Sequence, residues 1–132
     1  MTRAALVWLM AVSVACRVVP TDPELGQAVR LRLGASVRIP NDTMTVRFTD
    51  VTADSRCPQG AQCIWEGDAA TVFTTSGGTT FTLHTAAAGG ESSHFLAGKF
   101  MRLLVVEPTP RVGRSIAKRD YVVTIRFDAA LD

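Results

Sequence analysis

Apolar and polar residues alternate along much of the chain with a period of two. In residues 29–33 valine and leucine alternate with arginine, and apolar residues stand on both sides of Arg38. Because successive side chains of a strand point to opposite faces of its sheet, this pattern predicts half-buried strands. Residues 44–52 continue the alternation as far as Phe48, and the phase then changes before Val51. That change predicts a β-bulge.

The clearest hairpin is predicted where two threonine-rich segments, 69–75 and 79–85, are separated by Ser-Gly-Gly. A short turn with glycine is typical of the loop between two antiparallel strands. A loop of small residues is expected over 86–93. Further strands are expected over 100–107, which two prolines follow, and over 121–127.

The fold class predicted from these segments is all-β. No segment carries an apolar stripe at i, i+3 and i+4 over a helical length. About seven short strands with turn signals between them predict a small antiparallel β-sandwich of Ig-like architecture or a small barrel, and both stay open. An antibody-type domain bridges its sheets with distant cysteines, whereas Cys57 and Cys63 lie close together. The Ig likeness is therefore one of architecture only.

The first residues have the composition of an export signal. Arg3 is followed by the uncharged stretch 4–15, which is shorter than the ~20 residues that a membrane-spanning helix needs. Val-Ser-Val-Ala-Cys at 12–16 has the form of a bacterial lipoprotein cleavage site, so we expect residues 1–15 to be removed and Cys16 to be lipidated. An ordinary signal peptide stays open as the alternative. The leader resembles those of bacterial lipoproteins, in which an aspartate directly after the cysteine favours retention in the inner membrane. Here Arg17 follows Cys16, so the resemblance implies the outer membrane.

Cysteine count and charge set further limits. The chain has three cysteines; lipidation of Cys16 leaves Cys57 and Cys63, which in an oxidising compartment are expected to form a disulfide. Residues 16–27 contain two prolines and a glycine and are expected to be a flexible tether, with one β domain over 28–132. With 14 basic and 12 acidic residues the chain is near neutral, which argues against a nucleic-acid partner.

Residues 54–68 read Asp-Ser-Arg-Cys-Pro-Gln-Gly-Ala-Gln-Cys-Ile-Trp-Glu-Gly-Asp. This block resembles a set of uncharacterised bacterial exported proteins and lipoproteins that carry D-S-R-C-P-x4-C-x-W-x-G after a strand. That set has no established activity, so the resemblance implies export and an all-β fold but no reaction.

The block is also the candidate binding loop. Pro58 and the glycine at 60 favour a tight turn inside the disulfide ring. We expect Asp54 to accept hydrogen bonds from loop amides, Arg56 to pair with Asp54, Glu66 or Asp68, and Trp65 to pack over the disulfide or the sheet edge. The simplest interpretation is a stapled connection between strands.

Two functional hypotheses go beyond that interpretation. Loops on a rigid β scaffold commonly bind partner molecules. Trp65 and Arg56 are of the residue types that contribute most binding energy at interfaces. The expected partner is therefore an envelope protein or another ligand. The alternative is a protease inhibitor that presents Arg56 from the preorganised loop.

A metal-binding role in the periplasm is a further alternative. His84 and His94 are the only histidines. Structural zinc takes four ligands and catalytic zinc three, so Glu91 or Asp68 would have to join them. Copper(I) would prefer methionine ligands, for which Met44 and Met101 are the candidates. Two histidines are not a site, and the prediction is no metal and no cofactor.

Most catalytic motifs are missing. The sequence has no G-x-S-x-G, H-E-x-x-H or G-x-x-x-x-G-K-[ST] pattern. Ser115 and Lys118 have the spacing S-x-x-K, but neither S-D-N nor K-T-G accompanies them, so a non-catalytic binding or structural role is predicted. Four cations fall within residues 111–119. They suit either a solvated loop or contact with lipid phosphates near the anchored end. The cations are Arg111, Arg114, Lys118 and Arg119.

Overall fold

The computed structural model describes residues 22–131 of the chain. The predicted signal peptide (1–15), the predicted lipidation site at Cys16 and the first part of the predicted tether lie outside the described residues. Within residues 22–131 no helix has the length and the apolar character needed to cross a membrane.

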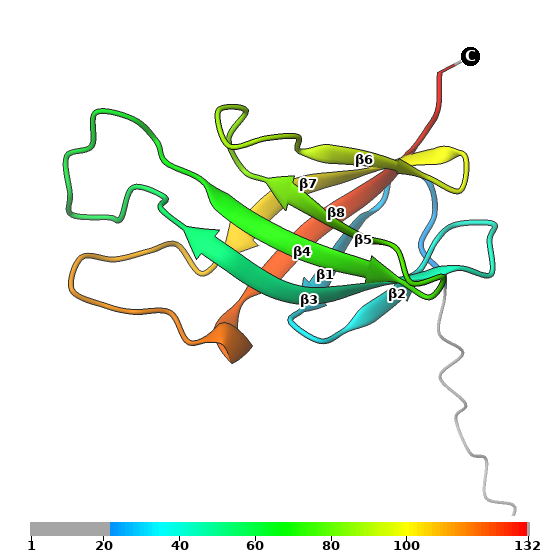
Figure 1. Ribbon diagram of the computed structural model, residues 1–132, viewed down its shortest axis with the longest axis horizontal. Helices are drawn as coiled ribbons and strands as arrows, with labels where there is room; N and C mark the ends of the chain where they lie inside the picture. The colour runs from blue at the N-terminus through cyan, green and yellow to red at the C-terminus, as the bar shows by residue number, and fades with distance from the viewer. Residues whose placement is uncertain (1–21, 132) are drawn as a thin grey trace, which may run out of the picture.

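Eight strands form two four-stranded sheets, and every pairing is antiparallel (Figure 1). One sheet has the strand order β1-β8-β7-β6, and the other has the order β2-β3-β4-β5. The strands are β1 (Ala28–Arg32), β2 (Ser36–Arg38), β3 (Thr45–Asp54), β4 (Ala69–Thr75), β5 (Thr80–His84), β6 (Ser93–Leu96), β7 (Lys99–Glu107) and β8 (Val122–Ala129).

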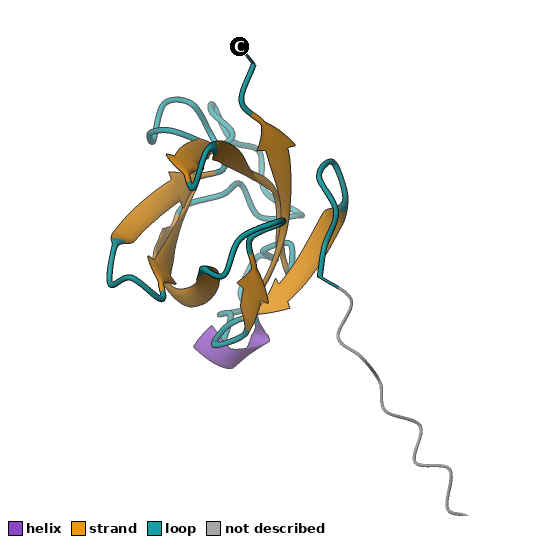
Figure 2. Ribbon diagram, turned by 90° about the vertical axis from the view of Figure 1, so that its right-hand side faces the viewer, coloured by secondary structure: helices purple, strands orange, loops and turns teal. Residues whose placement is uncertain are grey.

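The two sheets make a small β-sandwich, so the predicted all-β class is confirmed. Figure 2 shows the strands arranged around a common interior. About seven strands were expected and eight are present: β6 begins at Ser93, the last residue of the predicted loop, and continues through residues for which no element was predicted. A short 3-10 turn, Lys118–Asp120, precedes β8.

The core is made by the inward faces of the alternating strands. Phe48, Phe73 and Phe81 form a row of rings whose centroids lie 5.4 and 5.6 Å apart. From the other sheet, Met101 and Phe127 are fully buried in the same cluster. Burying a side chain of this size stabilises a fold by roughly 1.5–3 kcal/mol, so the alternating pattern itself supplies the driving force that joins the sheets.

The predicted irregularity in β3 is present. The register with β4 shifts between Phe48 and Asp50 and again between Val51 and Ala53. Since an extra residue reverses the alternation, Phe48 and Val51 are both buried although three positions separate them. Val51 is the last buried residue of the strand, which ends at residue 54, the first residue of the block singled out above.

The predicted β4–β5 hairpin is also confirmed, with its turn at Ser-Gly-Gly. The Gly78 amide donates to the Thr75 carbonyl at 2.9 Å, and Gly78 has a φ of 91°, which glycine adopts without strain. At the start of the described chain, residues 22–27 were expected to be part of the tether. They contact the domain. The Gly26 amide donates to the Phe127 carbonyl at 2.8 Å, and Asp22 pairs with Arg38 at 3.6 Å.

Candidate functional site

Two long loops lie at one end of the sandwich. Residues 55–68 join β3 to β4, and residues 108–121 join β7 to β8. Figure 1 places both loops at the end away from the start of the described chain. The two loops also contact each other. The Gln59 amide donates to the Pro110 carbonyl at 2.9 Å, and the Val112 amide donates to the Gln59 carbonyl at 3.2 Å. We call this end of the molecule the loop end.

The loop after β3 starts as an extension of the β3–β4 ladder. The Ser55 amide donates to the Asp68 carbonyl at 2.6 Å, and the Cys57 amide donates to the Glu66 carbonyl at 2.8 Å. A Cβ at Gly67 would lie 1.8 Å from the Ser55 carbonyl oxygen, so only glycine fits there. We call residues 55–68 the disulfide arm.

The predicted Cys57–Cys63 disulfide is confirmed, with an S–S distance of 2.05 Å. It starts at Cys57, the same residue whose amide makes the last ladder hydrogen bond, and joins it to Cys63. Pro58 follows Cys57 inside the ring, and its carbonyl accepts a hydrogen bond from the Ala61 amide at 3.2 Å, which makes the tight turn expected there. The arm is therefore tied at its base by the ladder and further out by the sulfur bridge.

A largely buried charged cluster fixes the base of the arm. Arg56 Nε and Nη2 donate to the two carboxylate oxygens of Asp54 at 2.8 and 2.7 Å, and the Tyr121 hydroxyl donates to Asp54 Oδ2 at 2.8 Å. The side chains of Asp54 and Arg56 are only 12% and 14% exposed. Of the three partners considered for Arg56, it pairs with Asp54. Asp54 also accepts from the Arg56 amide at 3.3 Å, as expected of a loop amide.

The cluster shifts the pKa values of both acids within it. Burial alone raises the pKa of the Asp54 carboxyl, but the hydrogen bonds from Arg56 and Tyr121 outweigh it and the pKa lies below its usual value. Burial, together with the hydrogen bond to the Asp54 carboxylate, raises the pKa of Tyr121 to about 12. At neutral pH the cluster is therefore a carboxylate, a guanidinium and a neutral phenol.

Arg56 is turned inward. Its Nη1 donates to the Val106 carbonyl at 2.6 Å and its Nη2 donates to the Pro108 carbonyl at 3.0 Å, at the end of β7 in the other sheet. A protease inhibitor loop must insert its specificity residue into the enzyme, and an arginine with its guanidinium held in this way is not offered to solvent. This geometry argues against the inhibitor hypothesis built on Arg56.

The tip of the arm is apolar and exposed. Ile64 is 90% exposed and Trp65 is 78% exposed. The expectation that Trp65 packs over the disulfide or the sheet edge is therefore wrong, because most of its side chain is exposed. Val112, on the neighbouring loop, is also largely exposed.

The loop 108–121, which contains the four cations named in the sequence analysis, also lies at the loop end. Lys118 pairs with Asp50 at 2.6 Å and also donates to the Val51 carbonyl. The hydrogen bond from Lys118 lowers the pKa of Asp50. Figure 1 shows this loop at the end of the sandwich that lies away from the first described residues.

Asp68 and His84 form a second polar pair. His84 Nδ1 lies 2.6 Å from Asp68 Oδ2, while Asp68 Oδ1 accepts from the Thr85 hydroxyl at 3.1 Å and the Ala86 amide at 3.0 Å. Burial raises the pKa of Asp68, but these hydrogen bonds, led by that of His84, bring it below its usual value. Sequence reasoning placed Asp68 beside His84 only as a metal ligand, and missed this pairing.

The backbone of the loop after β5 covers the pair. A Cβ at Gly89 would lie 2.1 Å from Asp68 Oδ2, and one at Gly90 would lie 2.5 Å from His84 Cδ2. In the sequence, the two adjacent glycines were the feature that could have predicted such a close approach of the loop backbone to the Asp68 and His84 side chains.

The histidines have separate surroundings. The ring of His94 stacks on Phe81 with centroids 4.1 Å apart, whereas His84 bonds to Asp68. Met101 is fully buried in the core. Over residues 22–131 there is no group of three or more histidine, cysteine, aspartate or glutamate side chains arranged to hold a metal ion.

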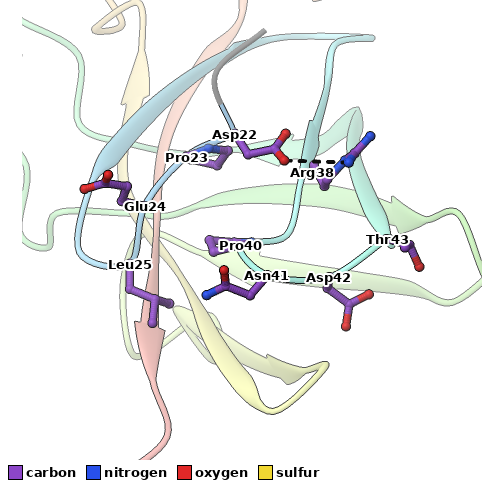
Figure 3. A pocket seen from close by; sticks show the side chains of 9 residues that line it. All are labelled: Asp22, Pro23, Glu24, Leu25, Arg38, Pro40, Asn41, Asp42 and Thr43. Atoms are coloured by element: carbon purple, nitrogen blue, oxygen red, sulfur yellow. Dashed lines mark ion pairs between the residues drawn. The ribbon is translucent and has the colours of Figure 1, made fainter.

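A polar groove of about 860 Å³ lies at the other end, where the described chain begins. Figure 3 shows it between the segment Asp22–Leu25 and the turn that follows β2. Its charges are already engaged in part: Asp22 pairs with Arg38 at 3.6 Å, and Asp42 Oδ1 accepts from the Met44 amide at 2.8 Å. The groove is thus a product of how the first segment docks on the turn.

No protein-family model matches the chain, and comparisons with curated proteins and with solved structures likewise find no match. The fold and the loop end define the class instead: a small antiparallel β-sandwich that carries a disulfide-closed arm with an apolar tip.

Proposed function

We propose that this protein is an exported, lipid-anchored domain of the bacterial cell envelope, favouring the outer membrane, that binds a partner protein through its loop end and is not an enzyme. The observation that carries the proposal is the pair of adjacent, exposed apolar side chains, Ile64 and Trp65, on an arm that is held rigid.

Exposure of these two side chains is costly unless something covers them. Each leaves apolar surface in water that burial would stabilise at roughly 25 cal/mol per Å². Isoleucine and tryptophan at a loop tip add nothing to the core, as their exposure shows. Contiguous apolar surface at such a position marks an interaction site, and tryptophan is among the residues that dominate binding energy at interfaces.

The arm is also preorganised for binding. The ladder extension, the Cys57–Cys63 bridge and the Asp54–Arg56 pair fix its base. Ordering a flexible loop on binding costs free energy, so a loop that is already ordered leaves more of the contact energy for affinity. This supports a binding role over that of a simple connection, which would not need an apolar tip.

The proposed anchor and the loop end are compatible. A lipid on Cys16 together with an acylated amine would supply the two or more chains that durable membrane attachment takes. A chain anchored before Asp22 would leave the disulfide arm at the far end of the long axis, facing away from the bilayer (Figure 1).

The test is site-specific photocrosslinking in intact cells. A photoreactive residue in place of Trp65 is expected to give one reproducible crosslinked envelope protein, whereas the same residue in place of Thr43, at the opposite end, is expected to give none. Equal crosslinking patterns at the two positions, or none at residue 65, would contradict the proposal.

The anchor is tested separately. Cells fed a fatty-acid analogue are expected to label the wild-type protein and not Cys16→Ala, as measured by gel fluorescence after click chemistry. Mass spectrometry showing an unmodified Cys16 in a chain that still begins at Met1 would disprove export by this route.

A further inference from the structure

A small hollow of about 330 Å³ lies beside the tip of the arm. Its walls come from two segments that are far apart in sequence. Trp65, Glu66 and Gly67 of the arm form one side, and Ala86, Ala88 and Gly89 of the loop after β5 form the other. Ser55 and Asp68 complete the lining. The glycines, the alanines and the exposed indole of Trp65 make much of this lining apolar.

The charge in this hollow has one sign. Two carboxylates line it, those of Glu66 and Asp68, and none of its lining residues is a lysine or an arginine. Asp68 is already engaged by His84, Thr85 and the Ala86 amide. Glu66 is exposed and has no ion-pair partner among residues 22–131. It is therefore the carboxylate that a bound group would meet.

We infer that this hollow receives the side chain of an arginine or lysine from the partner protein, an inference that rests on the proposed function of the loop end. The aliphatic stem of such a side chain lies along the alanine methyl groups. Its charged head lies over the face of Trp65 and reaches the Glu66 carboxylate. Tryptophan is the best aromatic partner for a cation, and arginine is the cation that most often stacks on it.

The same features disfavour other occupants. An anionic group would meet two carboxylates in a confined, partly apolar hollow, where like charges repel more strongly than in bulk water. A neutral apolar side chain would cover the indole but would leave Glu66 partly desolvated without a partner, which costs free energy. A cation with an apolar stem satisfies both surfaces at once.

The experiment uses the full-length protein and a matched pair of peptides, N-acetyl-Ala-Arg-Ala-amide and the same peptide with neutral citrulline in place of arginine. Binding is followed by NMR at the backbone amides of Ala88 and Gly89, at constant ionic strength. The arginine peptide is expected to give saturable shifts and to bind about fivefold to tenfold more tightly than the citrulline peptide. Equal binding of the two peptides, or no saturable shift at these amides, would overturn the inference.

Three variants locate the effect. Glu66→Gln and Trp65→Ala are each expected to weaken binding of the arginine peptide by about fivefold, since each removes one of the two contacts. Both residues are exposed, so neither change should disturb folding, which the melting temperature checks. Glu24→Gln, in the groove at the other end, is the matched control and is expected to leave binding unchanged. If Glu66→Gln binds as the wild type does, the hollow is not a cation site.

This result can be told apart from failure of the proposed function. Crosslinking at residue 65 without any preference for arginine over citrulline would overturn the cation site and leave the proposed binding role supported. Loss of crosslinking would overturn the binding role, and the peptide titration would then decide the cation site by itself.

Discussion

The Tyr121 hydroxyl donates a hydrogen bond of 2.8 Å to the Asp54 carboxylate, from a position 67 residues further along the chain. Asp54 is the last residue of β3, and Tyr121 immediately precedes β8, which belongs to the other sheet. Arg56 extends the connection to the carbonyl of Val106 in β7. One carboxylate thus organises a junction between the two sheets at the base of the disulfide arm. Asp54 and Arg56, at the start of the block, therefore have a structural role in joining the two sheets.

Tyr121→Phe is expected to lower the free energy of unfolding by about 2 kcal/mol at pH 7, because a hydrogen bond to a charged group is lost. Chemical denaturation measures the change. The variant keeps the ring, which is buried, so packing is preserved. A loss below the error of the measurement would show that the Tyr121 hydroxyl does not contribute to the junction.

Stability is also expected to fall at alkaline pH because of Tyr121. Its folded-state pKa of about 12 lies above the value of about 10 for an unfolded tyrosine, so the unfolded state releases the phenolic proton first. The contribution is fully present below pH ~10 and is lost as the pH rises toward the folded pKa. Since Tyr121 is the only tyrosine in the chain, phenolate absorbance follows it directly. A midpoint near 10 in the folded protein, or the same alkaline loss in Tyr121→Phe, would contradict this prediction.

Arg56→Ala is expected to destabilise the domain by about 3 kcal/mol, because it leaves Asp54 buried without its ionic partner. The inhibitor hypothesis expects the melting temperature to stay unchanged in this variant, so the two accounts differ. Arg47→Ala, which changes an exposed arginine of β3, is the matched control and should stay within about 0.5 kcal/mol of the wild type. An unchanged unfolding midpoint for Arg56→Ala would show that the contacts of Arg56 do not stabilise the domain.

The strands could be predicted because their signals are local. The alternation around Arg38, the phase change before Val51 and the Ser-Gly-Gly turn each lie within a few residues, and the structure reproduces all three. The strand β6 escaped prediction because it has four residues and follows a run of small residues that favour a loop. Its pairing with β7 through the turn at Ala97 and Gly98 is what makes it a strand.

The candidate site was predictable only in part, for the same reason. The disulfide joins near neighbours and was predicted from the sequence, and Asp54 was one of three partners considered for Arg56. The contacts that decide the role of Arg56 are with β7 and its end, 50 and 52 residues away, and no local pattern encodes them. The same holds for Trp65, whose surroundings depend on where the arm leaves the sheets.

Gly89→Ala is expected to destabilise the domain by about 1–3 kcal/mol, because the new methyl group would lie 2.1 Å from Asp68 Oδ2 and the backbone must move away. Gly77→Ala is the control: its Cβ would come no closer than 3.7 Å to any neighbouring atom. Thermal unfolding of both variants measures the difference. Equal midpoints would mean that the loop after β5 does not rest on the Asp68–His84 pair.

Removing the disulfide is expected to loosen the arm without unfolding the sandwich. Replacing Cys57 and Cys63 by serine should lower the free energy of unfolding by about 2 kcal/mol, since the bridge closes a short loop. The rung between Ser55 and Asp68 and the Asp54–Arg56 pair do not depend on sulfur, so hydrogen exchange should quicken within residues 57–66 and stay slow in β3 and β4. Because Trp65 would then have to be ordered on binding, crosslinking at that position should weaken in the same variant. Exchange that quickens equally across both sheets would show instead that the bridge supports the whole fold, and the arm could not be treated as a separately fixed binding element.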